Sequence, residues 1–398
     1  MIFLDHHATT PCDPRVVEAM LPFWTETFGN PHSSSHPMGR AAADAIQHAM
    51  ALMEQQLGCP AGKLVATSGA TESINLAVRG VMLHPRNRRR RLVTCTTEHP
   101  AMLETAEDLE KRHGVDVVRV PVHPNRTGQP GQVDLDALRD AVDEQTALVS
   151  VMWANNESGV VQPVCEIARI AHEAGALMHS DATQAVGTLA VSVQETDVDL
   201  LSASAHKFYG PKGVGLLVAG NGNRRVRLLP QTIGGGQQGG LRGGTMNPAG
   251  IVGMAHALAI AAAEPETRES ANLAAAALRQ QLFDALNAHV DGLTLNGPSL
   301  QASAGDSGDW QRLPGNLNLR LQQVEGETWM AAATEVAFSS GSACSSTDGL
   351  PSHVLLAMGL TESEARRSVR FGIGRGNTSD EIQKAAEALI AAYARVRG

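Results

Sequence analysis

Lys207 lies in a stretch whose residue types could form a Schiff base. A short apolar run at residues 200–201 is followed by Ser204, His206 and Lys207, and then by a turn rich in glycine and proline at residues 209–215. An amine at the end of a buried strand is desolvated, and desolvation lowers the pKa of a lysine, which makes it a better nucleophile. For an arbitrary lysine a solvated loop position is far more common, so this interpretation depends on the residues that accompany Lys207.

Residues 67–71 (Thr-Ser-Gly-Ala-Thr) lead from an apolar run into a helical pattern, which suits the binding of a phosphate. Backbone N–H groups and hydroxyls converge there on the positive end of a helix dipole. An ordinary N-cap explains the same residues equally well when they are considered alone.

His99 and Asp181 occupy comparable positions after two other apolar runs. His99 precedes a helical pattern and could stack on a flat cofactor or transfer protons, although a capping or surface histidine is as common. Asp181 ends an apolar run, where a carboxylate needs a cationic partner such as a pyridinium N–H; capping of the next helix is the alternative. A Schiff-base lysine, a carboxylate for a pyridinium, a phosphate cradle and a stacking ring together predict pyridoxal phosphate as the cofactor.

An alternation of strand and helix patterns must bring these residues together. The expected strands are residues 63–66, 91–96, 115–120, 146–153, 176–180, 199–202 and 213–218. Among the expected helices are residues 72–81, 100–113, 135–142 and 163–174. This alternation predicts an α/β fold with a mostly parallel sheet covered on both faces, and the ligand site of such a sheet lies beyond the carboxyl ends of its strands. Polar residues collect at those ends, and Asn156 and Gln184 are among them.

Length and composition predict a two-domain cytoplasmic protein. The chain has 398 residues, 43% of them hydrophobic, enough for two cores. No apolar run is long enough to cross a bilayer, and residues 1–10 lack the features of a signal peptide. A net charge of −9 disfavours nucleic acid as a partner. The five arginines within residues 86–91 are interpreted as a solvated loop rather than a docking patch.

The five cysteines are expected to be free thiols. Their number is odd and no CxxC pair occurs, which argues against a disulfide framework and against a zinc site, so no metal is expected. Cys344 lies among small residues at 339–346, a segment without apolar periodicity that should be flexible and should expose the thiol. The remaining four, which we interpret as structural, are Cys12, Cys59, Cys95 and Cys165.

Ten motifs together resemble one known family over nearly the whole chain. They are residues 4–14 (LDHHATTPCDP), 28–36 (FGNPHSSSH), 67–75 (TSGATESIN), 97–99, 155–162 (NNESGVVQ), 181–187 (DATQAVG), 204–215, 242–245, 339–346 (SSGSACSS) and 368–375 (SVRFGIGR). The chain resembles the cysteine desulfurases of the NifS and IscS type, which belong to the pyridoxal-phosphate-dependent class V aminotransferases. The resemblance implies fold type I: a large domain with a seven-stranded, mostly parallel sheet (residues 15–257), and a smaller α+β domain (residues 1–14 and 258–398) that carries a catalytic cysteine loop at about residues 339–348.

The resemblance also implies a role for individual residues. Lys207 would carry the cofactor, His99 would stack on its ring, Asp181 would hold the pyridinium nitrogen and Gln184 would meet the phenolic oxygen. The residues implied in phosphate binding are Ala70, Thr71, Ser204 and His206, with Thr245 supplied by the neighbouring subunit of a homodimer. The residues implied in binding the substrate carboxylate are Asn156, which also touches the cofactor, and Arg370, with Asn30 nearby.

The implied activity is the conversion of L-cysteine to L-alanine. The catalytic residues would be Lys207, His99 and Cys344, and Cys344 would hold the sulfur as a persulfide for an acceptor protein, such as one in iron–sulfur assembly. A selenocysteine lyase or another class V aminotransferase is the alternative within enzymes. A non-catalytic cofactor-binding sensor or a passive sulfur carrier is the alternative outside them, but the presence of Lys207 and Asp181 favours an enzyme.

Overall fold

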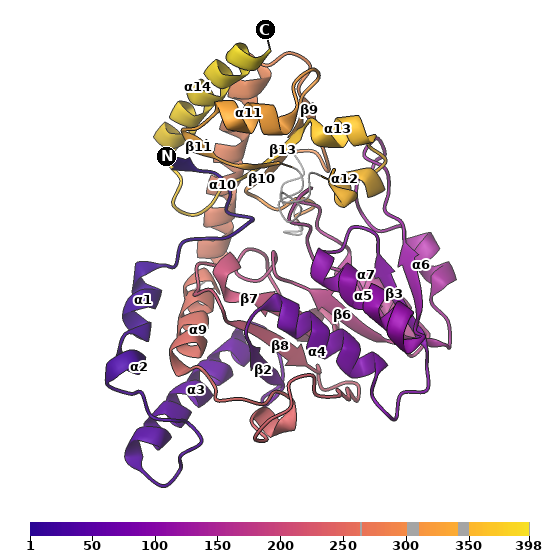
Figure 1. Cartoon of the computed structure of the whole chain (residues 1–398), viewed down its shortest axis with the longest axis vertical. Coiled ribbons are helices and arrows are strands. Elements are labelled where there is room, and N and C mark those ends of the chain that lie inside the picture. Colours follow the sequence, from indigo (N-terminus) through magenta and orange to yellow (C-terminus); the bar gives the residue numbers. More distant parts are fainter. Residues whose placement is uncertain (263–264, 301–309, 341–349, 398) are drawn as a thin grey trace.

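A computed structural model describes residues 1–262, 265–300, 310–340 and 350–397 of the chain. Figure 1 shows two parts, with a larger sheet and its helices below and a smaller sheet and its helices above; both chain ends lie in the upper part. Cys344 and most of the predicted cysteine loop lie outside the described residues.

The larger sheet has seven strands in the order β2-β8-β7-β6-β5-β3-β4. The strands are β2 (Leu64–Thr67), β3 (Arg91–Cys95), β4 (Asp116–Val120), β5 (Thr146–Ser150), β6 (Leu177–Asp181), β7 (Leu200–Ser204) and β8 (Gly215–Ala219). Strand β8 is antiparallel to β2 and β7, and all other neighbours are parallel. The predicted fold class is therefore confirmed. The largest shift of a strand end is in β5, which ends at Ser150 rather than at residue 153; the chain then leaves the strand and Ala154 bridges to Val161.

Helices cover both faces of this sheet. Alternate side chains of a strand point to opposite faces, and here they pack into two different hydrophobic cores. In β8, Leu217 packs with α4 (Ala70–Met82) and α5 (Pro100–His113), whereas Leu216 and Val218 pack on the opposite face. The helices of that opposite face include α3 (Pro37–Gln56), α7 (Val164–Glu173) and α9 (Pro248–Ala262).

All four predicted helices are present: they are α4, α5, α7 and α6 (Leu135–Ala141). The other short helices of the lower part are α1 (Pro14–Met20), α2 (Pro22–Thr25), α8 (Val193–Thr196) and the 3-10 turns η1 (Ala205–Lys207) and η2 (Gln238–Gly240). The long helix α10 (Pro265–Asn287) leads to the upper part (Figure 1). In the part of the chain that the structure describes, no helix combines the length and the apolar character needed to cross a membrane.

The arginine run at residues 86–91 is only partly solvated. Arg89 donates to the carbonyls of Thr146 (2.9 Å) and Ala174 (3.0 Å), so it ties the loop to the sheet and to α7. Arg86, Arg88 and Arg90 are exposed. The run is therefore in part a structural clamp, which the prediction of a solvated loop did not include.

The smaller sheet has the strand order β12-β13-β10-β9 and is antiparallel. Its strands are β9 (Thr294–Leu295), β10 (Asn316–Arg320), β12 (Ser339–Ser340) and β13 (Ser368–Gly372); β1 (Ile2–Phe3) pairs separately with β11 (Val336–Ala337). The helices are α11 (Gly326–Ala332), α12 (His353–Ala357), α13 (Glu362–Arg366) and α14 (Ser379–Val396). A separate core surrounds Trp329, whose ring centroid lies 5.7 Å from that of Phe338 and 6.0 Å from that of Phe371. The domain boundaries at 14/15 and 257/258 stay a prediction, and α9 continues through residue 257.

Residues 4–13, here called the N-terminal strap, connect the two parts. At one end the Gly372 N–H donates to the Leu4 carbonyl (2.7 Å), and at the other the Thr10 N–H donates to the His206 carbonyl (2.9 Å). A Cβ atom at Gly372 would lie 2.8 Å from the His7 backbone nitrogen, so the close approach of the strap to β13 requires glycine there.

Candidate active site

A cavity of about 570 Å³ lies at the carboxyl ends of the parallel strands, where the sequence predicted the site. It brings together most of the predicted site residues. Those that line it are Ala70, Thr71, His99, Asn156, Asp181, Gln184, Ser204, His206, Lys207 and Arg370. Cys344 lies outside the described residues, so its position relative to this cavity stays a prediction.

Asn30 and Thr245 do not line the cavity. Asn30 is exposed between α2 and α3, and its side-chain oxygen accepts from the His32 N–H (3.0 Å). Thr245 is also exposed, at the end of a glycine-rich loop that Arg242 holds through an ion pair with Glu72 (2.8 Å). Their roles stay predictions.

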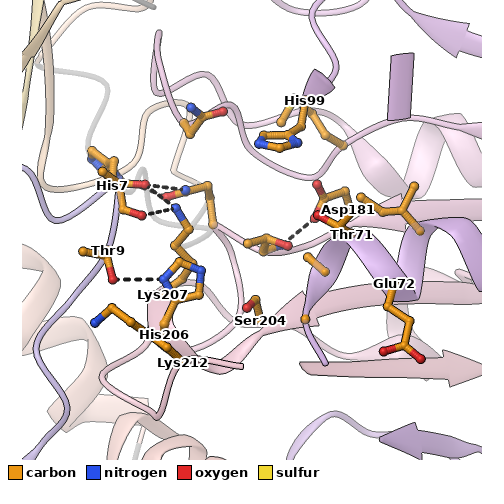
Figure 2. Close-up of a pocket in the computed structure, with 18 of the residues that line it drawn as sticks. His7, Thr9, Thr71, Glu72, His99, Asp181, Ser204, His206, Lys207 and Lys212 are labelled. Atoms are coloured by element: carbon orange, nitrogen blue, oxygen red, sulfur yellow. Dashed lines mark hydrogen bonds between the residues drawn. The ribbon is translucent and has the colours of Figure 1, made fainter. Parts of the chain in front are cut away.

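Lys207 follows β7 in the turn η1, and its side chain points toward the strap (Figure 2). Its amine donates to the carbonyls of His7 (2.6 Å) and Ala8 (2.7 Å). Tyr209 supports this turn: it has a φ of +66°, a strained value for a non-glycine residue, and its hydroxyl accepts from the Arg375 N–H (2.5 Å). The Lys207 turn is thus held by the strap and by the backbone at Arg375.

The N-terminus of α4 forms one wall of the cavity. Gly69 caps this helix with a φ of +153°, which L side chains rarely adopt, and a Cβ atom at Gly215 would lie 2.6 Å from the Gly69 Cα. The first N–H groups of a helix have no partner within the helix, and in α4 they belong to Ala70 and Thr71. A helix of 13 residues also presents its positive dipole end there, so this wall can bind a phosphate.

His206 lies beside this wall as a neutral ring. Burial lowers its pKa to about 4, with a further contribution from the charges of Lys207 and Lys212. Its Nδ1 lies 3.0 Å from the Thr9 hydroxyl of the strap (Figure 2). Lys212 lines the same cavity and adds positive charge near the predicted phosphate site.

His99 and Asp181 lie near each other at the other side of the cavity (Figure 2). His99 caps α5, and its Nδ1 accepts the Ala101 N–H (3.1 Å). Burial lowers the pKa of His99, so the ring is neutral at neutral pH, and the bond to Nδ1 assigns its one proton to Nε2. Asp181 is 5% exposed and accepts the Thr183 N–H (3.0 Å).

These residues fit pyridoxal phosphate. One cavity of suitable volume contains a lysine amine, a buried carboxylate that can face a pyridinium N–H, and a helix N-terminus with two flanking polar side chains, Ser204 and His206. This donor set matches the aldehyde, ring nitrogen and phosphate of the cofactor.

The comparisons with known proteins agree with this geometry. The model of the family "Aminotransferase class-V" matches residues 2–385. The chain belongs to the class V aminotransferase family. Its relative "Cysteine desulfurase IscS" from Anaeromyxobacter dehalogenans is 46% identical over 96% of this chain and 90% of that protein. A solved "NIFS-LIKE PROTEIN" has a TM-score of 0.87 at 34% identity, over 99% of this chain and 100% of its own. A solved "SspA in complex with cysteine" has a TM-score of 0.78 at 31% identity, over 95% and 100%.

The class V aminotransferases depend on pyridoxal phosphate, so the predicted cofactor and the predicted enzyme class are confirmed. The remaining polar residues of the cavity are placed to support the cofactor and the substrate.

Arg370 is fully buried in β13 and projects into the cavity. Its guanidinium pairs with Asp5 of the strap (2.7 Å) and donates to the Ser339 hydroxyl (3.1 Å) and the Asn156 carbonyl (3.2 Å). Its Nε is buried and has no hydrogen-bond partner among the described residues. Sequence reasoning missed Asp5 as a site residue, although the motif at residues 4–14 contains it.

His7 is a second strap residue that sequence reasoning missed. Its Nδ1 lies 3.1 Å from the side-chain oxygen of Gln184, and the amide nitrogen of Gln184 donates to the His7 carbonyl (3.0 Å). Burial, followed by the charge of Arg370, lowers the pKa of His7 to about 3, so this ring is neutral. Gln184 is thereby fixed to the strap at the edge of the cavity.

Glu98 is a buried carboxyl next to His99. One oxygen accepts the Met152 N–H (2.6 Å), and the other has no hydrogen-bond partner among the described residues. Burial, together with the nearby Asp181 carboxylate, raises the pKa of Glu98 well above its usual range. Burial at this position therefore favours the neutral form of the Glu98 carboxyl.

Glu98→Gln should make the free energy of unfolding depend less on pH. Above its ordinary pKa of 4.5, the unfolded chain releases the Glu98 proton while the folded protein keeps it, so the free energy of unfolding falls as pH rises toward the folded pKa. One such proton changes stability by up to about 1.4 kcal/mol per pH unit. Urea unfolding between pH 5 and 7 should show a smaller slope in the variant. Some slope should remain, because burial also raises the pKa of Glu157. A slope like that of the exposed control Glu18→Gln would contradict the raised pKa of Glu98.

Proposed function

We propose that this protein is a cysteine desulfurase, which removes sulfur from L-cysteine, releases L-alanine and holds the sulfur on Cys344. The observation that carries the proposal is that one cavity contains Lys207, Asp181 and His99 together with the buried guanidinium of Arg370. The relative named cysteine desulfurase, 46% identical over nearly the full length, supports it.

Each residue of the cavity has a distinct task in this reaction. When bound, pyridoxal phosphate supplies an electron-accepting pyridinium ring that makes the Cα proton of the substrate acidic. Asp181 holds the ring nitrogen, Arg370 binds the substrate carboxylate, and the Lys207 amine takes the Cα proton. The His99 ring has its proton on Nε2, because Nδ1 accepts the Ala101 N–H. In this state Nε2 can donate a hydrogen bond or a proton to the sulfur of the substrate but cannot accept one.

The sulfur step requires a thiolate. The Cys344 sulfur attacks the substrate sulfur, the Cβ–S bond of the substrate breaks, and a persulfide forms on the enzyme while Cβ gains a proton to give alanine. Cys59 and Cys95 are unsuited to this task, because burial raises their pKa values to about 12 and about 11. Cys12 is half-buried, whereas Cys165 is exposed on α7, which its apolar neighbours did not predict.

The activity itself is tested by product analysis. Purified protein loaded with cofactor should form alanine from L-cysteine, with one sulfide released per alanine when a reducing thiol is present. Selenocysteine serves as the comparison substrate. Alanine from selenocysteine alone would favour the selenocysteine lyase, and transamination to a keto acid would favour another class V aminotransferase.

Arg370→Lys should weaken the binding of cysteine by about tenfold, because lysine cannot make the two parallel hydrogen bonds that a guanidinium makes with a carboxylate. Cysteamine, which lacks the carboxylate, should bind equally to both proteins. Spectral titration of the cofactor band with each compound measures this difference. Arg375→Lys, in the turn that follows β13, is the control: its side chain pairs with Asp13, and the variant should bind both compounds as the wild type does. Equal weakening for cysteine and cysteamine would contradict the assigned role of Arg370.

We further propose a homodimer in which Thr245 binds the phosphate in the partner's site. Its exposure and its absence from the cavity of its own chain support this role. The neighbouring Ile233 is 91% exposed, which suits a surface that another subunit covers. We also propose a cytoplasmic location, with an acceptor protein that takes the sulfur.

Mixed dimers test the shared site. A dimer of one Lys207→Ala subunit and one Thr245→Ala subunit should regain one intact site, because the wild-type Lys207 and the wild-type Thr245 then meet across the interface. Its activity should approach half that of the wild type, well above the Thr245→Ala homodimer. Activity at or below half that of the Thr245→Ala homodimer would show that Thr245 serves its own chain.

A further inference from the structure

The amine of Lys207 lies against two backbone carbonyls of the N-terminal strap. The distances from Nζ are 2.6 Å to the His7 oxygen and 2.7 Å to the Ala8 oxygen (Figure 2). Hydrogen bonds from a charged donor are shorter and stronger than those from a neutral one. Two such acceptors from adjacent residues form a site that favours an ammonium group over a neutral amine.

The strap is held in place by contacts that do not involve Lys207. The Ala8 N–H donates to the Asp5 carbonyl (3.0 Å), which closes a tight turn, and the Thr9 hydroxyl lies 3.0 Å from Nδ1 of His206. The Gln184 amide donates to the His7 carbonyl (3.0 Å). The two carbonyls are therefore oriented before an amine arrives, so little ordering cost remains when it binds.

The same strap also binds Arg370 through Asp5. Asp5 and the two carbonyl residues are only two to three positions apart, so a single short turn sets the spacing between the guanidinium and the Lys207 amine. This turn therefore connects the two groups that the proposed function assigns to the substrate carboxylate and to the Cα proton.

We propose that the carbonyl oxygens of His7 and Ala8 receive the Lys207 amine once the substrate has replaced it on the cofactor, and hold it as it takes the Cα proton. The inference rests on the proposed function and adds a positioning element to it. The amine gains the proton from Cα and becomes an ammonium, the electron pair of the C–H bond stays with the substrate carbon, and the two carbonyls accept hydrogen bonds from the new ammonium. No further reactant is needed.

Semisynthesis can weaken these two acceptors without changing a side chain. Cys12 supplies the N-terminal cysteine for ligation, so a synthetic selenoester peptide of residues 1–11 can be joined to residues 12–398 and the full chain refolded with cofactor. A thioamide at His7, at Ala8 or at both replaces a carbonyl oxygen by sulfur, a weaker acceptor. A thioamide at Thr9 is the matched control, because the Thr9 carbonyl accepts no hydrogen bond from the described residues.

The exchange of the Cα proton of L-alanine in heavy water, followed by NMR, isolates the proton transfer from the sulfur step. The double thioamide should slow this exchange by about tenfold and each single one by about threefold, as expected for weakened hydrogen bonds to a charged group. Covalent loading of the cofactor, the melting temperature and the affinity for alanine should stay unchanged, as should all properties of the Thr9 control. Unchanged exchange in the double thioamide would overturn the proposal. An equal loss of exchange and stability in the Thr9 control would also overturn it, because the strap would then act only as a structural support.

A crystal structure of the unmodified holoenzyme with bound L-alanine gives a second test that does not depend on refolding. It should show Nζ of Lys207 within hydrogen-bond distance of both carbonyls. An amine that instead contacts the Ser204 hydroxyl, beside the N-terminus of α4, would overturn the proposal. If the enzyme exchanges the Cα proton normally but forms no alanine from cysteine, the proposed function is wrong. The proposal for the His7 and Ala8 carbonyls would still stand.

Discussion

Cys344→Ser should lower the rate of alanine formation from L-cysteine by about 1,000-fold or more, which is the usual scale for loss of a nucleophile. Lys207, Asp181 and Arg370 bind the substrate and remove its Cα proton, and these steps need no thiol. A serine hydroxyl is almost fully protonated at neutral pH and cannot replace a soft thiolate in the attack on sulfur. The variant should therefore still bind cofactor and cysteine, which absorbance spectra measure, while product analysis shows almost no alanine.

Cys165→Ser is the matched control for this variant, since Cys165 is an exposed thiol on α7. It should retain the wild-type rate. If instead Cys344→Ser forms alanine from cysteine at nearly the wild-type rate, Cys344 is not the sulfur acceptor. The selenocysteine lyase would then gain support, because selenium can leave the substrate without a protein thiol to receive it.

Lys207→Ala should abolish covalent attachment of the cofactor and reduce turnover by about 1,000-fold or more. The chain has few lysines, and of those that the structure describes only Lys207 and Lys212 line the cavity. Borohydride reduction followed by peptide mapping should find the cofactor on Lys207 in the wild type and nowhere in the variant.

Lys212→Ala is the informative comparison for that experiment. Lys212 is exposed at the phosphate side of the cavity, so its loss should weaken cofactor binding but leave the covalent bond to Lys207 intact. Cofactor found on Lys212 in the wild type would contradict the assignment of Lys207.

Most of the sheet was predictable because its signals are local. Buried parallel strands have continuous apolar runs, and the residues that follow them reach one edge whatever the details of packing. Lys207, Asp181 and His99 were found in this way. The strand ends were less accurate, as at β5, because the end of a strand depends on the partner strand rather than on its own composition.

The contacts of the strap could not be predicted from local patterns. Asp5 meets Arg370 across 365 positions of sequence, and the His7 carbonyl meets Lys207 across 200. A single carboxylate or carbonyl gives no sign of such a partner. The motif at residues 4–14 indicated that this segment matters, but only the geometry shows that it connects the two charged groups of the site.

The strap has a consequence for how the protein is made. Arg370 is synthesised 365 residues after Asp5, which takes roughly 20 to 70 seconds at about 5–20 residues per second. Until β13 has been synthesised, the Leu4 carbonyl lacks the Gly372 N–H, so the strap has only one of its two attachments when the Lys207 turn emerges. Completion of the site, and with it productive capture of the cofactor, should therefore wait until β13 has emerged and folded.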